Sequence, residues 1–320
     1  MLKVAILGAG GISGAHVPGW KKIPEAKIVA ICDVMPERLE KYKDIDANFY
    51  ENCDEMLANE EIDIVDICLP TFLHAEYAIK AMEKGINVIC EKPISLNKDD
   101  VDRVYAVAEK NNVKFMIAHV LRFWPEFNFL RDAVKNETYG KFLSGHMYRL
   151  GCTPKWSWEN WMRREECSGL VPFDLHIHDL DYIIYTLGVP VNCITHRAQY
   201  NDIDIINATY EFADGTFLTC DSHWVTSDYP FNFGFRFCFE NGVIELAADK
   251  LMVYPVGSPA FEVKEEAENS DGAVINLPAT DAYYEEIRYF ANCVLENKPA
   301  DIIKPQELKT VLELIENFKK

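Results

Sequence analysis

Basic residues are scarce relative to acidic ones: 32 lysines and arginines stand against 51 aspartates and glutamates, a formal net charge of -19. Nucleic acids and anionic membrane surfaces are bound through basic patches, so this balance argues against both partners. Long apolar runs are also missing. The first run, Val4–Leu7, is too short for a signal-peptide core, and no apolar span reaches the ~18 residues that suggest a membrane helix. We therefore expect a soluble, cytoplasmic protein.

The cysteine spacings of metal and redox sites are absent as well. None of the 10 cysteines forms a C-x-x-C pair, and five fall inside strand-like runs, where a thiol packs as a small hydrophobe: Cys32, Cys68, Cys90, Cys220 and Cys238. Cys152 and Cys167 lie in a loop-like region without an adjacent histidine, so we interpret them as free thiols. No metal is predicted.

The length of 320 residues indicates two domains. Strand-like and helix-like runs alternate up to His119, with strands expected over 2–7, 27–32, 63–69, 86–90 and 114–118 and helices over 72–84 and 98–111. This alternation predicts a doubly wound parallel sheet. The later runs are strands joined by hairpin signals, Asp214-Gly215 and Asn241-Gly242, which indicate a large open, antiparallel or mixed sheet in a second α/β domain. We predict domains of 1–120 and 121–320.

A glycine turn follows the first strand, in the segment G-A-G-G-I-S-G-A-H that spans residues 8–16. Glycines at 8 and 10 permit a tight turn and let the backbone approach a pyrophosphate, whose charge is held at the start of the next helix. Pro18 and Gly19 are expected to interrupt that helix early. Alone, this motif is a weak signal.

The second strand ends at Asp33, 23 residues after Gly10. A carboxylate there accepts both ribose hydroxyls of an adenosine and repels a 2′-phosphate, which favours NAD over NADP. Arg38, on the following helix, keeps NADP open as a second cofactor.

The strand Ile86–Cys90 stops abruptly at Glu91, Lys92 and Pro93. The proline forbids the strand to continue and restricts Lys92, and ligands of parallel sheets bind beyond the carboxyl ends of strands. Lys92 is therefore a candidate for chemistry, although a solvated lysine in a surface turn would give the same three residues.

A later segment, Phe173–Gly188, has apolar residues at helical spacing. Asp174 and His178 are four residues apart, one turn above the other on another face. An imidazole beside a carboxylate is suited to accept a proton near neutral pH. The helix would point His176 roughly opposite to His178, which argues against a shared metal.

Two further features carry open alternatives. The segment 156–164, W-S-W-E-N-W-M-R-R, either forms a wall against a nicotinamide or sugar or anchors a loop. Five phenylalanines alternate along one strand and face either helices of the same domain or a partner subunit: Phe231, Phe233, Phe235, Phe237 and Phe239.

Together these segments resemble the Gfo/Idh/MocA family of oxidoreductases, the relatives of glucose-fructose oxidoreductase and inositol dehydrogenase. The resemblance is carried by the glycine turn, C-D-V at 32–34, L-P-T-F-L-H at 69–74, C-E-K-P at 90–93, D-L-H-I-H at 174–178 and the closing segment 282–294. It implies a Rossmann domain followed by a substrate-binding domain that often forms the oligomer interface, here a dimer or tetramer. The family's frequent cis peptide at this point directs attention to the Lys92–Pro93 bond.

The resemblance also assigns site residues. It places the catalytic role on Lys92, Asp174 and His178. Cofactor contacts carry over onto the following set, to which we add Arg38: Gly8, Gly10, Gly11, Ile12, Asp33, Leu69, Thr71, His74, Glu91, Lys92 and His119. His119 stands where many relatives have asparagine, and His74 alternatively packs at a helix end. Substrate contacts are expected from Arg122, Trp161, Arg163, Asp174 and His178.

The predicted function is an NAD(P)-dependent transfer of hydride between a nicotinamide and a secondary hydroxyl of a sugar, inositol or related polyol. The same residues would serve an enzyme that oxidises a glycoside transiently, eliminates the aglycone and recycles NAD. A non-catalytic NAD-binding regulator is the third possibility, and it would require that the site be lost.

Overall fold

The computed structural model describes residues 1–264 and 281–319. The described residues fall into two compact units, 1–120 with 281–305 and 121–264 with 306–319. This division differs from the predicted second domain, 121–320, because helix α9 (Ala282–Leu295) belongs to the first unit. The cause is close packing on α1 (Ser13–Lys21): a Cβ added to Gly19 would lie 2.9 Å from Cδ1 of Ile287.

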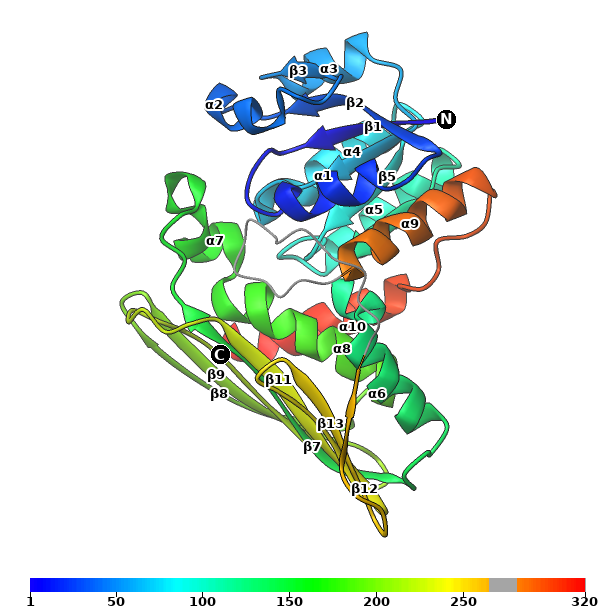
Figure 1. Cartoon of the computed structure of the whole chain (residues 1–320). Helices are drawn as coiled ribbons and strands as arrows, with labels where there is room; N and C mark the ends of the chain where they lie inside the picture. Colours follow the sequence, from blue (N-terminus) through cyan, green and yellow to red (C-terminus); the bar gives the residue numbers. More distant parts are fainter. Residues whose placement is uncertain (265–280, 320) are drawn as a thin grey trace. The chain divides into compact units, whose positions relative to one another are not determined.

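The first unit is built on a six-stranded, wholly parallel sheet in the order β3-β2-β1-β4-β5-β6 (Figure 1). The strands are β1 (Leu2–Leu7), β2 (Ala26–Cys32), β3 (Asn48–Tyr50), β4 (Ile64–Ile67), β5 (Asn87–Glu91) and β6 (Phe115–Ala118). The four residues of β4 and of β6 are all buried, as expected for a parallel sheet covered on both faces. The predicted doubly wound sheet is confirmed.

The helices of this unit largely follow the predicted ranges. The segment 72–84 forms η2 (Thr71–Leu73) and α4 (His74–Met82), and 98–111 forms α5 (Asp99–Lys110). The expected interruption of α1 is wrong, because the helix runs through Pro18 to Lys21. Short elements between β2 and β4 had no clear sequence pattern: α2 (Pro36–Leu39), η1 (Glu40–Tyr42), β3 and α3 (Cys53–Asn59).

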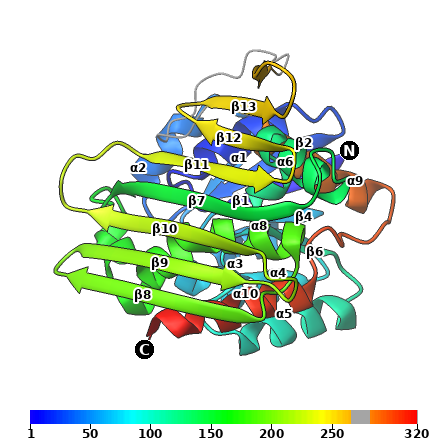
Figure 2. The ribbon, with the colours of Figure 1, turned by 90° about the horizontal axis from the view of Figure 1, so that it is seen from below.

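The second unit contains an eight-stranded sheet in the order β14-β13-β12-β11-β7-β10-β9-β8 (Figure 2). All neighbours are antiparallel except β7 and β10, so the prediction of a mixed sheet is confirmed. The strands are β7 (Phe142–Cys152), β8 (Asn192–Tyr200), β9 (Ile203–Glu211), β10 (Phe217–Val225), β11 (Asn232–Phe239), β12 (Gly242–Ala247), β13 (Lys250–Pro255) and β14 (Phe261–Val263). Asp214-Gly215 and Asn241-Gly242 lie at the two predicted hairpin turns.

Helices of this unit lie on one side of this sheet (Figure 1). They are η3 (Val120–Phe123), α6 (Pro125–Lys135), η4 (Trp158–Arg163), α7 (Glu165–Ser168), a π-helical turn η5 (Pro172–His176), α8 (Ile177–Leu187), α10 (Pro305–Ile315) and η6 (Glu316–Lys319). The phenylalanine face of β11 lies against them: the rings of Phe235 and Phe127 are 5.2 Å apart, centroid to centroid. Of the two alternatives, the helices of the same unit therefore cover this face. No helix in 1–264 or 281–319 is long and apolar enough to cross a bilayer.

Candidate active site

The glycine turn between β1 and α1 has the shape that a dinucleotide needs. Gly8 has φ +103°, and a Cβ there would lie 2.5 Å from the carbonyl oxygen of Cys68, so only glycine fits. A Cβ on Gly10 would meet no atom within 4 Å, which leaves this backbone open to a ligand. Gly11 and Ile12 follow directly, and α1 begins at Ser13. This open backbone at a helix start fits the pyrophosphate of NAD.

Asp33 lies at the end of β2, beside this turn. Its Oδ2 atom accepts a hydrogen bond from the amide of Ala9 at 2.7 Å, and Oδ1 accepts from the amide of Met35 at 2.9 Å. Arg38 Nη1 is 3.8 Å from Oδ2, so the two residues that were expected to act on the ribose do lie together. Each carboxylate oxygen keeps further acceptor capacity for a ribose hydroxyl.

Lys41 also lies beside the glycine turn, which the sequence did not suggest. Its Nζ donates to the carbonyl of Gly10 at 2.8 Å and lies 4.7 Å from the centroid of the Tyr42 ring. Burial lowers the pKa of Lys41, and the charge of Arg38 acts in the same direction. A second cation therefore accompanies Arg38 at the site that would hold the adenosine ribose.

The strand β5 ends at Glu91, and the Lys92–Pro93 peptide is cis. Glu91 is buried, and its Oε2 atom accepts a hydrogen bond from the amide of Lys92 at 3.1 Å. Glu91 pairs in register with Ala118 of β6, so the buried His119 follows on the neighbouring strand. The structure thus brings these predicted cofactor residues together at the carboxyl end of the sheet.

His74 touches the backbone on both sides of its ring. Nδ1 lies 2.6 Å from the carbonyl oxygen of Pro93, and Nε2 lies 2.7 Å from that of Leu69. Burial lowers the pKa of His74, while the two carbonyls act in the opposite direction. Its polar atoms therefore join the loops after β4 and β5, and the buried Thr71 begins the intervening turn. This arrangement matches the alternative in which His74 packs at a helix end.

A buried network of polar side chains links α1 to β4 and β5. His16 on α1 contacts Asp66 of β4 through Nδ1, at 2.9 and 3.0 Å, and Glu91 through Nε2, at 2.9 Å. Trp20 Nε1 donates to Asp66 at 2.7 Å. The sequence analysis overlooked this network. The available signal was Asp66 itself, because an acid inside a fully buried parallel strand requires a polar partner.

In the second unit, the stretch from Val171 to Leu180 is buried except at Asp174 and His178, which are partly exposed. The expected continuous α-helix is wrong at its start: Pro172–His176 is a π-helical turn, and α8 begins at Ile177. Such π turns often occur at functional positions.

His176, as expected, points to a different environment from His178. Its Nε2 lies 2.6 Å from the hydroxyl of Tyr210, and Nδ1 lies 3.3 Å from that of Ser222. Burial, with a smaller contribution from the charge of Arg149, lowers the pKa of His176 to about 3. His176 is therefore neutral and packs against the sheet.

The predicted substrate residues differ in their placement. The Arg122 side chain is fully buried and pairs with Asp181 and Glu307, so its guanidinium is used inside the unit and the structure gives no support to a substrate contact. Arg163 forms an ion pair with Asp202. Trp161 is partly exposed on η4, while the neighbouring Trp156 is 63% exposed. The aromatic wall remains a prediction.

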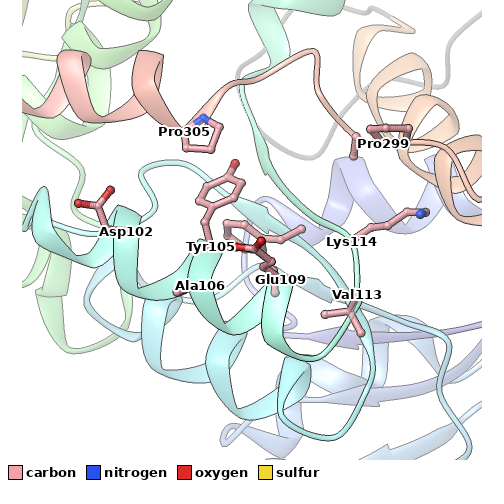
Figure 3. Close-up of a pocket in the computed structure, with 11 residues that line it drawn as sticks. Asp102, Tyr105, Ala106, Glu109, Val113, Lys114, Pro299 and Pro305 are labelled. Carbon is pink, nitrogen blue, oxygen red and sulfur yellow. The ribbon is translucent and has the colours of Figure 1, made fainter.

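Away from these residues, a surface pocket of about 540 Å³ lies between α5 and the segment Pro299–Pro305 (Figure 3). Tyr105, Glu109 and Lys114 line it, and Lys114 directly precedes β6. It therefore lies at the amino end of β6, opposite the carboxyl ends of the strands, where ligands of parallel sheets bind. We do not assign the cofactor to it.

The glycine turn, the acid at the end of β2 and the parallel sheet define a Rossmann nucleotide-binding unit, here followed by a second unit with a mixed sheet. Residues 2–119 match the family model described as "Oxidoreductase family, NAD-binding Rossmann fold", and residues 127–245 match "GFO/IDH/MocA C-terminal domain". These segments cover more than half of the chain. The chain belongs to the Gfo/Idh/MocA family, and the match to its NAD-binding model confirms the prediction that NAD is the cofactor.

Named relatives share part of their length with this chain. The chain is 31% identical over 235 residues to 2,7-anhydro-N-acetylneuraminate hydratase of Mediterraneibacter gnavus, covering 69% of this chain and 62% of that protein. It is 32% identical over 193 residues to myo-inositol 2-dehydrogenase of Thermotoga maritima, covering 59% and 56%. The matches thus span less than two thirds of these relatives.

Solved structures agree in fold. Levoglucosan dehydrogenase, in complex with NADH and levoglucosan, superposes with a TM-score of 0.85 over 99% of this chain and 96% of that chain, at 18% identity. At this identity the likeness concerns the fold alone.

Proposed function

We propose that the protein is an NAD(P)-dependent oxidoreductase that transfers a hydride between a nicotinamide and a secondary hydroxyl of a sugar, inositol or related polyol. The observation that carries the proposal is Lys92, an amine placed directly after β5 at the carboxyl end of a sheet that also bears the open glycine turn and Asp33. Named relatives include a myo-inositol dehydrogenase, which supports a polyhydroxylated substrate.

In this mechanism, NAD supplies the hydride acceptor. His178 takes the hydroxyl proton from the substrate oxygen as the carbon loses its hydride. Lys92 donates a hydrogen bond to the same oxygen and stabilises its developing negative charge. Asp174 binds a neighbouring hydroxyl or tunes Lys92. The products are a ketone, the reduced cofactor and one proton, so atoms and charge balance.

Activity of two single variants tests this assignment. A positioned acid or base contributes about 10² to 10⁴ in rate. Lys92→Ala and His178→Ala should each lose at least that order in kcat and still bind NAD in calorimetry. The substrate for these assays is found by testing a panel of sugars, inositols and sugar acids with NAD or NADP. Turnover is measured as the absorbance of the reduced cofactor. Retained turnover in both variants would refute the roles.

A second candidate function is NAD-recycling cleavage of a glycoside. A ketone formed transiently acidifies the neighbouring C–H, and the leaving group is eliminated and departs with the abstracted proton. Water then adds to the resulting double bond and the hydride returns to the ketone, so no net reduced cofactor accumulates. The relative named as a hydratase favours this candidate, because adding water is not a net oxidation. Release of nitrophenol from a nitrophenyl glycoside without reduced cofactor would distinguish it from the first function.

We also propose a cytoplasmic homo-oligomer, a dimer or tetramer. The solvent-facing side of β8, β9 and β10 carries exposed apolar side chains, among them Ile194, Ile205 and Phe217. Ten free cysteines suit a reducing compartment. Sedimentation of the wild type and of Ile205→Asp tests the interface: the variant should sediment as a smaller species, and a monomeric wild type would refute it.

A further inference from the structure

Both ring nitrogens of His16 face carboxylate oxygens. Nδ1 lies 2.9 Å from Oδ2 of Asp66, and Nε2 lies 2.9 Å from Oε1 of Glu91, with the His16 and Asp66 side chains fully buried. A neutral imidazole carries one N–H, so one of these contacts would set a lone pair against a carboxylate. Only the imidazolium donates to both.

The surroundings favour this charged form. Burial alone would lower the pKa of His16, but the charge of Asp66 and its hydrogen bond raise it well above the ordinary value. Burial likewise opposes the ionised form of Glu91, while the hydrogen bond and charge of His16 lower its pKa. Other groups also surround the network: the indole of Trp20 and the thiol of Cys68 donate to Asp66, and the Tyr283 ring lies 5.9 Å from the imidazole. The charges of Lys92 and His74 act on Glu91 and also lower its pKa.

A metal is a weaker explanation of the same cluster. His16, Asp66 and Cys68 could offer one ligand atom each within 4.8 Å of one another. Both histidine nitrogens, however, already lie at hydrogen-bond distance from carboxylates. Burial raises the pKa of the Cys68 thiol to about 12, so the thiol stays protonated. The described contacts are those of a hydrogen-bonded ion network.

We propose that His16 is a positioning residue for Lys92: a permanently charged imidazolium that ties Glu91 to Asp66 and so fixes the turn from which Lys92 projects. The link is short, because Glu91 Oε1 contacts His16 while its Oε2 accepts the amide of Lys92 at 3.1 Å. Since His16 lies on α1, directly after the glycine turn, the network joins the cofactor turn to the lysine. The catalytic meaning of Lys92 rests on the proposed function.

The protonation state can be measured without turnover. In the full-length protein with ¹⁵N-labelled histidine, both nitrogens of His16, assigned through couplings to the backbone, should show imidazolium shifts from pH 6 to pH 9. In Asp66→Asn the same signals should titrate within this range. A neutral His16 tautomer at pH 9 in the wild type overturns the proposal, whatever the enzyme proves to catalyse.

The positioning role requires a second readout. Trinitrobenzenesulfonate modifies lysine amines, and mass spectrometry gives the rate at Lys92. His16→Gln should change this rate and lower kcat by about 10², because a small misplacement of a reacting group costs that order. NAD affinity should stay within about threefold, or about 0.7 kcal/mol.

The matched control is Trp20→Phe, which removes a donor to Asp66 but leaves the His16 bridge. It should keep the wild-type rate at Lys92 and the wild-type kcat. A folded His16→Gln with an unchanged Lys92 rate overturns the proposal, and if this variant does not fold the wild-type NMR measurement decides. If the wild-type protein turns over no substrate of the panel, only the proposed function is contradicted.

Discussion

The guanidinium of Arg122 donates two hydrogen bonds to the carboxylate of Asp181, from Nε to Oδ2 at 2.9 Å and from Nη2 to Oδ1 at 2.7 Å. Its remaining Nη1 atom donates to Glu307 at 2.8 Å, and the Tyr185 ring lies 4.4 Å from its central carbon. This buried cluster joins η3, α8 and α10 within the second unit.

Removal of Arg122 should therefore affect stability. Arg122→Ala removes the guanidinium that pairs with the buried carboxylate of Asp181, and breaking a buried ion pair in this way costs roughly 3 to 5 kcal/mol. Arg131→Ala is the matched control, since Arg131 lies over the same Tyr185 ring but is half-exposed, and it should cost at most about 1 kcal/mol. Urea denaturation measures both. A stable Arg122→Ala with a raised substrate KM would instead support the predicted substrate contact.

The two glycines of the turn should respond differently to alanine. Gly10→Ala adds a methyl group to open space, so the thermal midpoint should hold while NAD binding weakens by at least about tenfold, or 1.4 kcal/mol. Gly8→Ala forces a Cβ against Cys68 and should destabilise the unit itself. Calorimetry with NAD and a thermal scan separate the effects. Unchanged NAD affinity in Gly10→Ala would argue against a pyrophosphate there.

Cofactor preference should depend on Asp33, Arg38 and Lys41. Asp33→Asn removes the negative charge that repels a 2′-phosphate, while Arg38 and Lys41 remain, so the ratio of the NADP and NAD dissociation constants should fall about tenfold. The further change Arg38→Ala should raise it again. Titration with each cofactor, followed by protein fluorescence, gives the ratios. An unaltered ratio in both variants would place the preference elsewhere.

His176 should make the protein sensitive to acid. Its pKa is about 3 in the folded state, below the ordinary 6.5, so the unfolded chain binds more protons between these values. Stability therefore falls as pH decreases through this window, by up to ~1.4 kcal/mol per unit. His176→Gln should flatten this dependence in urea denaturation at pH 7, 6 and 5. The exposed His196→Gln should retain the wild-type slope, and a steep slope in His176→Gln would contradict the account.

Residues whose signal is local can be predicted from the sequence, whereas residues defined by distant partners cannot. Lys92 was predicted because local signals define it: a short apolar strand, an acid and a proline adjoin it. The burial of Arg122 could not be predicted, because its partners Asp181 and Glu307 are 59 and 185 residues away and no local pattern reveals them. The His16 network was missed for the same reason, since only the strand order brings β4 and β5 beside α1.

The packing of α9 on α1 also has a consequence for protein synthesis. The ribosome completes the strands of the nucleotide-binding unit by Ala118, yet the helix that covers Gly19 ends only at Leu295. During synthesis the first unit therefore keeps one apolar surface uncovered until nearly the whole chain has emerged. A recombinant fragment of residues 1–120 should accordingly aggregate, whereas one that restores 281–305 in trans should remain dispersed.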